Sequence, residues 1–265
     1  MKKLFPSELI YQIFALLIAF IFVHAIYVAV IRPNADAFTA VEKVQFSQDA
    51  NYEPQRSAYV VLRDFEQEAC FVLLLWAIAI LGYKAMASRR QQKQLMLDLV
   101  GLPEGEFVTV ESAEQTSALI RKRIPEAAQD YLLSRVMLAA IDRFSATRSV
   151  QDASSVVQAV CDAESERTES ELSIIRYIAW AIPSVGFIGT VRGIGDALSQ
   201  AHRAVEGDIT GVTESLGVAF NSTFIALVIS IFLMFLIHSQ QTAQERLVLD
   251  VKRYCDDWFV RRLRV

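Results

Sequence analysis

AIPSVGFIGTVRGI, at residues 181–194, and ESLGVAFNSTFIALVIS, at residues 214–230, are the two stretches that decide the fold of this chain. Both read as hydrophobic helices that carry glycines and hydroxyls, instead of charges, in their apolar cores. A helix that faces lipid has no use for Asn221, Ser222 and Thr223 inside its apolar run, because polar groups in hydrocarbon must find partners within the protein. We therefore expect these two helices to face other helices.

The composition places the chain among membrane proteins. Its mean hydropathy is +0.31, and 53% of its 265 residues are hydrophobic, which is typical of a chain with spanning helices. A net charge of −4, without a basic stripe interleaved with aromatics, argues against a nucleic-acid partner. The three cysteines, Cys70, Cys161 and Cys255, form no metal or redox motif, so we interpret them as packing thiols.

Four segments are long and apolar enough to cross a lipid bilayer, which needs about 20 residues. The sequence predicts an all-α integral membrane protein with four transmembrane helices, a helical cytoplasmic section between the second and third, and a short cytoplasmic C-terminal helix. The predicted parts are a cytoplasmic N-terminus at 1–8, transmembrane helices at 9–31, 65–86, 174–198 and 214–238, a periplasmic loop at 32–64, a cytoplasmic helical domain at 87–173, a periplasmic turn at 199–213 and a cytoplasmic amphipathic tail at 239–265.

The distribution of positive charge sets the predicted orientation. Lys and Arg are dense between residues 84 and 176 and in the tail, whereas the 199–213 turn has only Arg203. The positive-inside rule then puts both termini in the cytoplasm of a bacterial inner membrane. The 32–64 segment, broken by Pro33 and Pro54, is expected to be a loop in which short helices can form. His24 is interpreted as a snorkelling or hydrogen-bonded structural histidine.

The 87–173 section is predicted to consist of helices. A helix at 84–99 continues the second span and ends at GLPEG, residues 101–105. Ser112 with Gln115 predicts a capping box, and Pro125 suits the first turn of the next helix. Ser149 is expected to cap a long helix whose acidic stretch at 162–166 is a solvated face. We find no strand pattern, no phosphate cradle and no catalytic cluster, so the sequence predicts no enzyme activity.

Small residues form a stripe on each of the last two spans. Gly186, Gly189 and Gly193 share one face of the third span, which permits close helix contact. The matching stripe on the fourth span consists of Ala219, Thr223, Ala226 and Ser230. Pro183 removes a backbone donor and predicts a kink or loosening of the third span.

Thr190 and Thr223 lie close to these stripes, where their hydroxyls would face a neighbouring helix. For any one hydroxyl taken alone, a bond back to its own helix is the simpler interpretation. The cluster of Asn221, Ser222 and Thr223 opposite a Gly/Thr face favours a functional one.

The apolar cores of the four spans contain no Asp, Glu or Lys. A proton pump or cation transporter normally places such a group at mid-membrane. If this chain conducts protons, another chain must supply the carboxylate. We expect no metal and no cofactor, and a surface built for another protein's helix.

The two stretches resemble the MotA/TolQ/ExbB family of ion-channel subunits. The similarity lies in Pro183 through Gly193, above all Gly189-Thr190-Val191 followed by Gly193, and in LGVAFNSTFIA at residues 216–226. Two such motifs in order, on the last two spans and after a large helical section, carry the resemblance.

This resemblance implies a homopentamer around two copies of a single-helix partner of the MotB/TolR/ExbD type, each with one membrane aspartate. Ion flow would load that aspartate, and the pentamer would rotate around the partner pair. The resemblance further implies that Thr190 lines the ion path, that Thr223 with Ser222 matches the Thr-Thr pair of MotA-like members, and that Pro183 is the family's kinked proline.

The chain also departs from these relatives. TolQ and ExbB have three spans, and Ala219 stands five residues after Glu214 where they have threonine, so Glu214 receives no ion-path role. The tail is shorter than that of MotA. Our leading hypothesis is a motor subunit that uses ion flow, H⁺ first with Na⁺ as the alternative, to drive a partner mechanically. The second hypothesis is a four-helix membrane scaffold or adaptor without ion conduction.

Overall fold

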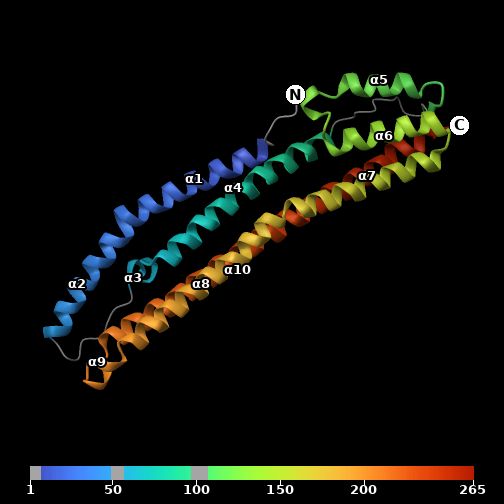
Figure 1. Cartoon of the computed structure of the whole chain (residues 1–265). Coiled ribbons are helices and arrows are strands. Elements are labelled where there is room, and N and C mark those ends of the chain that lie inside the picture. Colours follow the sequence, from blue (N-terminus) through green and yellow to red (C-terminus); the bar gives the residue numbers. More distant parts are fainter. Residues whose placement is uncertain (1–6, 49–56, 97–106) are drawn as a thin grey trace. The chain divides into compact units, whose positions relative to one another are not determined.

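A computed structural model describes residues 7–48, 57–96 and 107–265 of the chain. In this part the chain is helical apart from turns and two short strands (Figure 1). The elements of its first half are α1 (Ser7–Ile26), the π-helix η1 (Tyr27–Ile31), α2 (Arg32–Gln48), α3 (Ala58–Leu62), α4 (Phe65–Gln94), β1 (Val108–Thr109), α5 (Ala113–Arg123) and the 3₁₀-helix η2 (Glu126–Ala128). Those of its second half are α6 (Leu132–Thr147), α7 (Val150–Glu171), α8 (Ser173–Ser199), α9 (Ala201–Val205), α10 (Thr210–Tyr254), the π-helix η3 (Cys255–Phe259), the 3₁₀-helix η4 (Val260–Arg262) and β2 (Leu263–Arg264).

The predicted membrane fold is confirmed at the level of its spans. Among the described residues, four helical stretches are long and apolar enough to cross a bilayer, namely Glu8–Gln45, Phe65–Gln94, Val150–Ser199 and Thr210–Arg262. Many large apolar side chains on these stretches are exposed, which suits a lipid environment. The chain is a helical, multi-pass membrane protein.

Two compact units divide the chain. The membrane unit consists of Met1–Gly82 and Ile174–Ile237, and the helical unit consists of Tyr83–Ser173 and His238–Val265. The helices α4, α8 and α10 each contribute to both units.

In the membrane unit, α1 packs antiparallel to α4. The Tyr11 hydroxyl donates to the Ala79 carbonyl at 3.1 Å, and the Trp76 indole N–H donates to the Gln12 carbonyl at 2.9 Å. Both bonds give amphipathic side chains a partner that hydrocarbon does not offer. A small apolar cluster of Val23, Tyr27, Ile31 and Val72 fills the contact nearer to the start of α4.

The prediction of a loop at residues 32–64 is wrong for 32–48, where the structure has α2 in direct continuation of α1. Pro33 lacks an N–H and its ring would clash with the carbonyl of residue 29 in a regular helix. The π-helical turn η1 widens the helix there, as π-bulges do where a helix must absorb an irregularity. In the same turn, Asn34 Nδ2 donates to the Val30 carbonyl at 2.7 Å. Pro54 lies outside the described residues.

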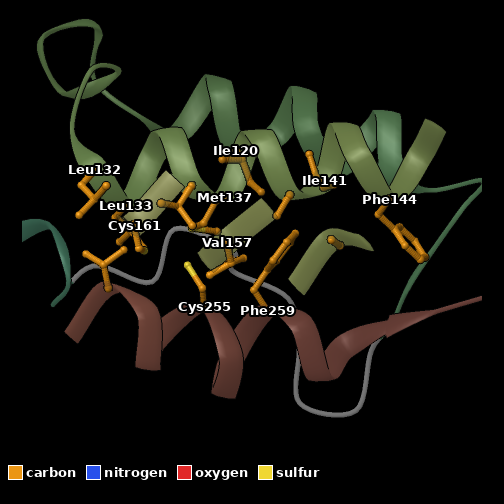
Figure 2. Close-up of a cluster of buried hydrophobic side chains, with 14 of the residues drawn as sticks. Ile120, Leu132, Leu133, Met137, Ile141, Phe144, Val157, Cys161, Cys255 and Phe259 are labelled. Carbon is orange, nitrogen blue, oxygen red and sulfur yellow. The ribbon is translucent and has the colours of Figure 1, made fainter. Parts of the chain in front are cut away.

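The helical unit has its own apolar core, formed by α5, α6, α7 and the end of α10 with η3 (Figure 2). The face of α6 that contacts this core carries Leu133, Val136, Met137, Ile141 and Phe144, all at most 1% exposed. These positions recur at the three- and four-residue spacing of a helix. The apolar side chains of the amphipathic tail are buried in the same core: they are Leu247, Val251, Cys255 and Phe259.

The structure confirms one predicted helix cap in this unit and contradicts another. Ser149 caps α7 as expected, since its Oγ accepts the Asp152 N–H at 3.2 Å. Ser112 stands at the N-cap of α5, but its hydroxyl bonds back to Thr109 and makes no capping bond, so the capping box is wrong. Pro125 precedes the short η2, and α6 begins only at Leu132. α4 ends at Gln94, and GLPEG lies outside the described residues.

Two further expectations are corrected. The strands β1 and β2 form a parallel pair with Val108 opposite Leu263, where the sequence showed no strand pattern. Two-residue strands are too short to produce an alternation of apolar and polar residues. Glu164, in the acidic stretch taken as solvated, is only 7% exposed and binds Arg135 Nη1 at 2.9 Å.

Candidate functional site

The site is built on the close, antiparallel contact of α8 and α10, which run side by side in Figure 1. Gly186, Gly189 and Gly193 are buried on the face of α8 that meets α10. A Cβ placed on Gly193 would lie 2.7 Å from Ala219 N and 2.7 Å from the Ser215 carbonyl oxygen, which are backbone atoms that cannot turn away. The two small-residue stripes therefore face each other within one chain, and their contact leaves no room for a side chain on α8.

Thr190 and Thr223 meet inside this contact. Their Oγ1 atoms are in hydrogen-bond contact with each other, Thr190 Oγ1 lies 3.1 Å from the Ala219 carbonyl, and Thr223 Oγ1 lies 3.1 Å from the Gly186 carbonyl. Each hydroxyl has one hydrogen to donate and can accept others. Two hydrogens thus serve three acceptors, namely two carbonyls and one of the two hydroxyls. The pair is short of donors and can accept a further hydrogen bond.

Pro183 and Ser230 form a second hydroxyl–backbone unit on the same pair of helices. α8 is continuous across Pro183, which has no N–H for the carbonyl four residues earlier, that of Ala179. Ser230 Oγ donates to that Ala179 carbonyl at 3.3 Å. The hydroxyl on α10 therefore replaces the hydrogen bond that the proline removes, as membrane helices with prolines require.

Ser222 and Asn221 point to different surroundings, although they are neighbours of Thr223. Ser222 is buried, and it packs against Gly189: a Cβ placed on Gly189 would lie only 2.6 Å from Ser222 Oγ. Its hydroxyl donates to the Val218 carbonyl at 2.8 Å. Asn221 lines a cavity of about 530 Å³ between α2, α3 and α10, together with apolar residues that include Phe38, Phe220 and Phe224. The structure thus brings Thr190, Thr223 and Ser222 together and leaves Asn221 on another side of α10.

The first turn of α4 supplies functional groups that the sequence reasoning missed. Glu66 forms a two-pronged ion pair with Arg192 on α8, at 2.8 Å for both contacts. Gln67, which is fully buried, donates to Ser222 Oγ at 3.4 Å. Glu68 is 6% exposed and binds His24 Nδ1 at 2.7 Å as well as the Arg32 guanidinium. Successive residues of a helix point about 100° apart, so these three reach α8, α10 and α1–α2 respectively.

A signal for this turn does exist in the sequence. Two carboxylates at Glu66 and Glu68 stand at the very start of an apolar span, while Arg32 and Arg192 stand at the edges of two others. Opposite charges at the ends of neighbouring spans pair because the low dielectric there strengthens their attraction. Just before the turn, burial raises the pKa of the Asp64 carboxyl above its usual value, against the opposing effect of Arg63 and Arg192.

Within the described residues, no group of three or more His, Cys, Asp or Glu side chains is placed to hold a metal ion. The charged side chains near the hydroxyls are engaged in ion pairs with one another. Around the two threonines, the site offers hydrogen bonding by hydroxyl, amide and carbonyl groups.

Comparison with known proteins bears on this same region. Residues 128–253 match the MotA/TolQ/ExbB proton channel family. The family that the glycine–threonine motifs predicted is confirmed over this segment, which holds α6 to α9 and nearly all of α10 and covers just under half of the chain. No curated protein and no solved structure gave a match to the chain.

The family match contains the α8–α10 contact with its glycine stripe and its threonine pair, but not the first turn of α4. The groups at residues 66–68 are thus features of this chain that the family match does not describe.

Proposed function

We propose that the chain is the channel-forming subunit of an ion-driven motor complex. The observation that carries the proposal is the donor-poor pair of Thr190 and Thr223 on the glycine-packed helices of a MotA/TolQ/ExbB proton channel segment. A hydroxyl can donate to a carboxylate or accept from a protonated carboxyl. The pair therefore suits a carboxyl group that changes its protonation state as ions pass.

That carboxyl comes from a partner in this proposal. Glu66 and Glu68, the acidic residues near the hydroxyls, are held by Arg192 and by His24 with Arg32. A partner with a single transmembrane helix and one membrane aspartate, present in two copies, would supply the missing group. The chain itself would form a homopentamer around that pair, with H⁺ as the coupling ion and Na⁺ as the alternative.

The proposed location is the bacterial inner membrane, with both termini and the helical unit in the cytoplasm. The excess of Lys and Arg between residues 84 and 176 and in the tail supports this orientation. The turn that contains α9 would then lie in the periplasm. Reporter fusions at Gly207 and at Val265 should give opposite sidedness; fusions that report the same side would contradict the topology.

The proposed function is tested by removing one hydroxyl. Thr190→Ala should lower ion flux and mechanical output by at least about tenfold, the ratio that corresponds to one hydrogen bond of roughly 1.4 kcal/mol. Ser184→Ala is the matched control on α8, because among the described residues the Ser184 hydroxyl bonds to the Trp180 carbonyl of its own helix and not to α10. Flux of the purified complex in liposomes and subunit number by native mass spectrometry are measured together.

Unchanged flux in Thr190→Ala would contradict the proposal, and a subunit number other than five would contradict the pentamer. The second candidate, a membrane scaffold without conduction, is favoured by the fact that Thr190, Ser222, Thr223 and Ser230 all bond to carbonyls of their own chain. A scaffold would show no flux with any partner, and Thr190→Ala would then retain full biological function.

A further inference from the structure

Gln67 on α4 is a fully buried amide whose oxygen has no hydrogen-bond donor among the described residues. Its Nε2 donates to the Val61 carbonyl at 3.2 Å and to Ser222 Oγ at 3.4 Å. Burial of an amide oxygen without a donor is unfavourable, because the oxygen loses the hydrogen bonds that it makes to water in the unfolded chain. A residue type that carries this cost in a membrane unit, where an apolar side chain would avoid it, indicates a use for the oxygen.

The orientation of this amide is set by its neighbours. Val61 belongs to the last turn of α3, and its carbonyl needs a donor there because helix ends leave carbonyls unpaired. If Oε1 and Nε2 of Gln67 exchanged places, Oε1 would face the Val61 carbonyl oxygen, and the two acceptors would repel each other. Ser222 cannot supply the missing hydrogen, since its hydroxyl donates to the Val218 carbonyl at 2.8 Å. Oε1 therefore stays an acceptor that the described residues leave unpaired.

Ser222 links Gln67 to the threonine pair. The Ser222 hydroxyl occupies the space that Gly189 leaves open on α8, and Gly189 and Ser222 directly precede Thr190 and Thr223. Polar groups thus follow one another from α4 through Ser222 to the hydroxyls of the proposed ion path. All of these residues belong to the membrane unit.

We propose that Gln67 holds a water molecule beside Ser222 and extends the polar path of the threonine pair to α4, an inference that rests on the proposed function for its purpose. Water donates the hydrogen bond that Oε1 requires, and a buried water of this kind typically makes two to four hydrogen bonds to otherwise unpaired groups. An amide does not titrate, so Gln67 is a positioning residue that orders water at the path.

Two substitutions separate this role from the capping of α3. Gln67→Glu keeps an oxygen acceptor and loses the N–H that binds the Val61 carbonyl. Gln67→Met keeps the length of the side chain and loses both groups. If the oxygen matters, Gln67→Met lowers ion flux by about tenfold with an unchanged subunit number. Gln67→Glu then retains flux and adds an inflection to its pH profile. If only the cap matters, both variants lose stability and flux to the same extent.

An electron microscopy map of the full chain in lipid nanodiscs, at a resolution that shows ordered waters, tests the water without a partner. Density within hydrogen-bond distance of Oε1 in the wild type, lost in Gln67→Met, is expected. A dry amide, or a protein donor on Oε1, overturns the inference. If flux falls in Thr190→Ala but stays at the wild-type level in Gln67→Met, the inference about Gln67 is overturned and the proposed function stands. Wild type without flux contradicts the proposed function, and the water density alone then decides on the site.

Discussion

At the scale of single residues, the hydrogen-bond partners of hydroxyls and the neighbours of glycines decide what each side chain does. The Ser184 hydroxyl and the Thr190 hydroxyl are both on α8. The first bonds to the Trp180 carbonyl of its own helix, whereas the second bonds to the Gly186 carbonyl of its own helix and also reaches α10. Likewise, Gly193 touches the α10 backbone, whereas Gly195 has open space around it. Ser184 and Thr190 both carry a hydroxyl and Gly193 and Gly195 are both glycines, so the difference within each pair comes from the face of the helix on which each residue stands.

The glycine pair gives a direct prediction. Gly193→Ala should destabilise the membrane unit by about 1–3 kcal/mol, because its Cβ would overpack against backbone atoms of α10. Gly195→Ala should be neutral or slightly stabilising, since alanine is the better helix former. Thermal unfolding of both variants in detergent measures the effect. Equal midpoints for the two variants would show that the helices are not in close contact at Gly193.

Burial also fixes the reactivity of the cysteines. Cys161 is 1% exposed, and burial raises the pKa of its thiol to about 11. Burial also raises the pKa of Cys255 well above its usual value. Since the thiolate is the reactive form, we predict no maleimide labelling of these thiols at pH 7.5 in the folded protein and full labelling in denaturant, as counted by mass spectrometry. Because the folded pKa of Cys161 is raised, its thiol form favours folding up to pH 9, and this contribution is lost as the pH rises toward 11.

At the scale of elements, helices remain continuous where the sequence suggests a break, because a neighbour or a local widening replaces the lost hydrogen bond. α8 passes through Pro183 with Ser230 on the orphaned Ala179 carbonyl. The α1–α2 helix passes Pro33 after a π-helical turn. A proline in a membrane helix therefore marks a place where a partner group is needed, rather than an end.

A double-mutant cycle tests the pairing at Pro183. Ser230→Ala should cost about 1 kcal/mol in the wild-type background, the size of an interhelical hydrogen bond in membranes. In the Pro183→Ala background it should cost clearly less, because the new backbone N–H at position 183 then serves the Ala179 carbonyl. Equal costs in both backgrounds would mean that Ser230 and Pro183 act independently.

In the helical unit, an ion pair joins α6 to α7. Glu164 is 7% exposed and accepts from Arg135, with Arg167 a further 3.7 Å contact. Glu164→Gln should destabilise the unit by about 1–3 kcal/mol, since it weakens a partly buried charged bond. Glu166→Gln, on the exposed face of the same helix, should change stability by less than about 0.5 kcal/mol. A denaturant titration monitored by circular dichroism distinguishes the two.

At the scale of the whole molecule, two units with separate cores share three long helices. The membrane unit is held by small-residue contact, ion pairs and hydroxyl bonds, whereas the helical unit has a dense apolar core. The proposed topology, with the helical unit in the cytoplasm, accounts for this division, because burial of apolar side chains stabilises a fold in water but gives little between helices in lipid. Substitutions in α6 and in the glycine stripe should therefore act on different unfolding steps.

The sequence by itself determined the four spans, the family segment, the glycine stripe and the hydroxyls, because hydropathy and helical spacing are local properties of the chain. Only the tertiary structure decided that the two stripes meet each other, that Ser222 turns to Gln67 while Asn221 does not, and that Glu66, Gln67 and Glu68 bind three different helices. The helix of residues 32–48 and the buried Glu164 also appeared only there. The physical reason is that the partner of a polar group in a low-dielectric interior is set by which helices are neighbours, and no local pattern of residues records that.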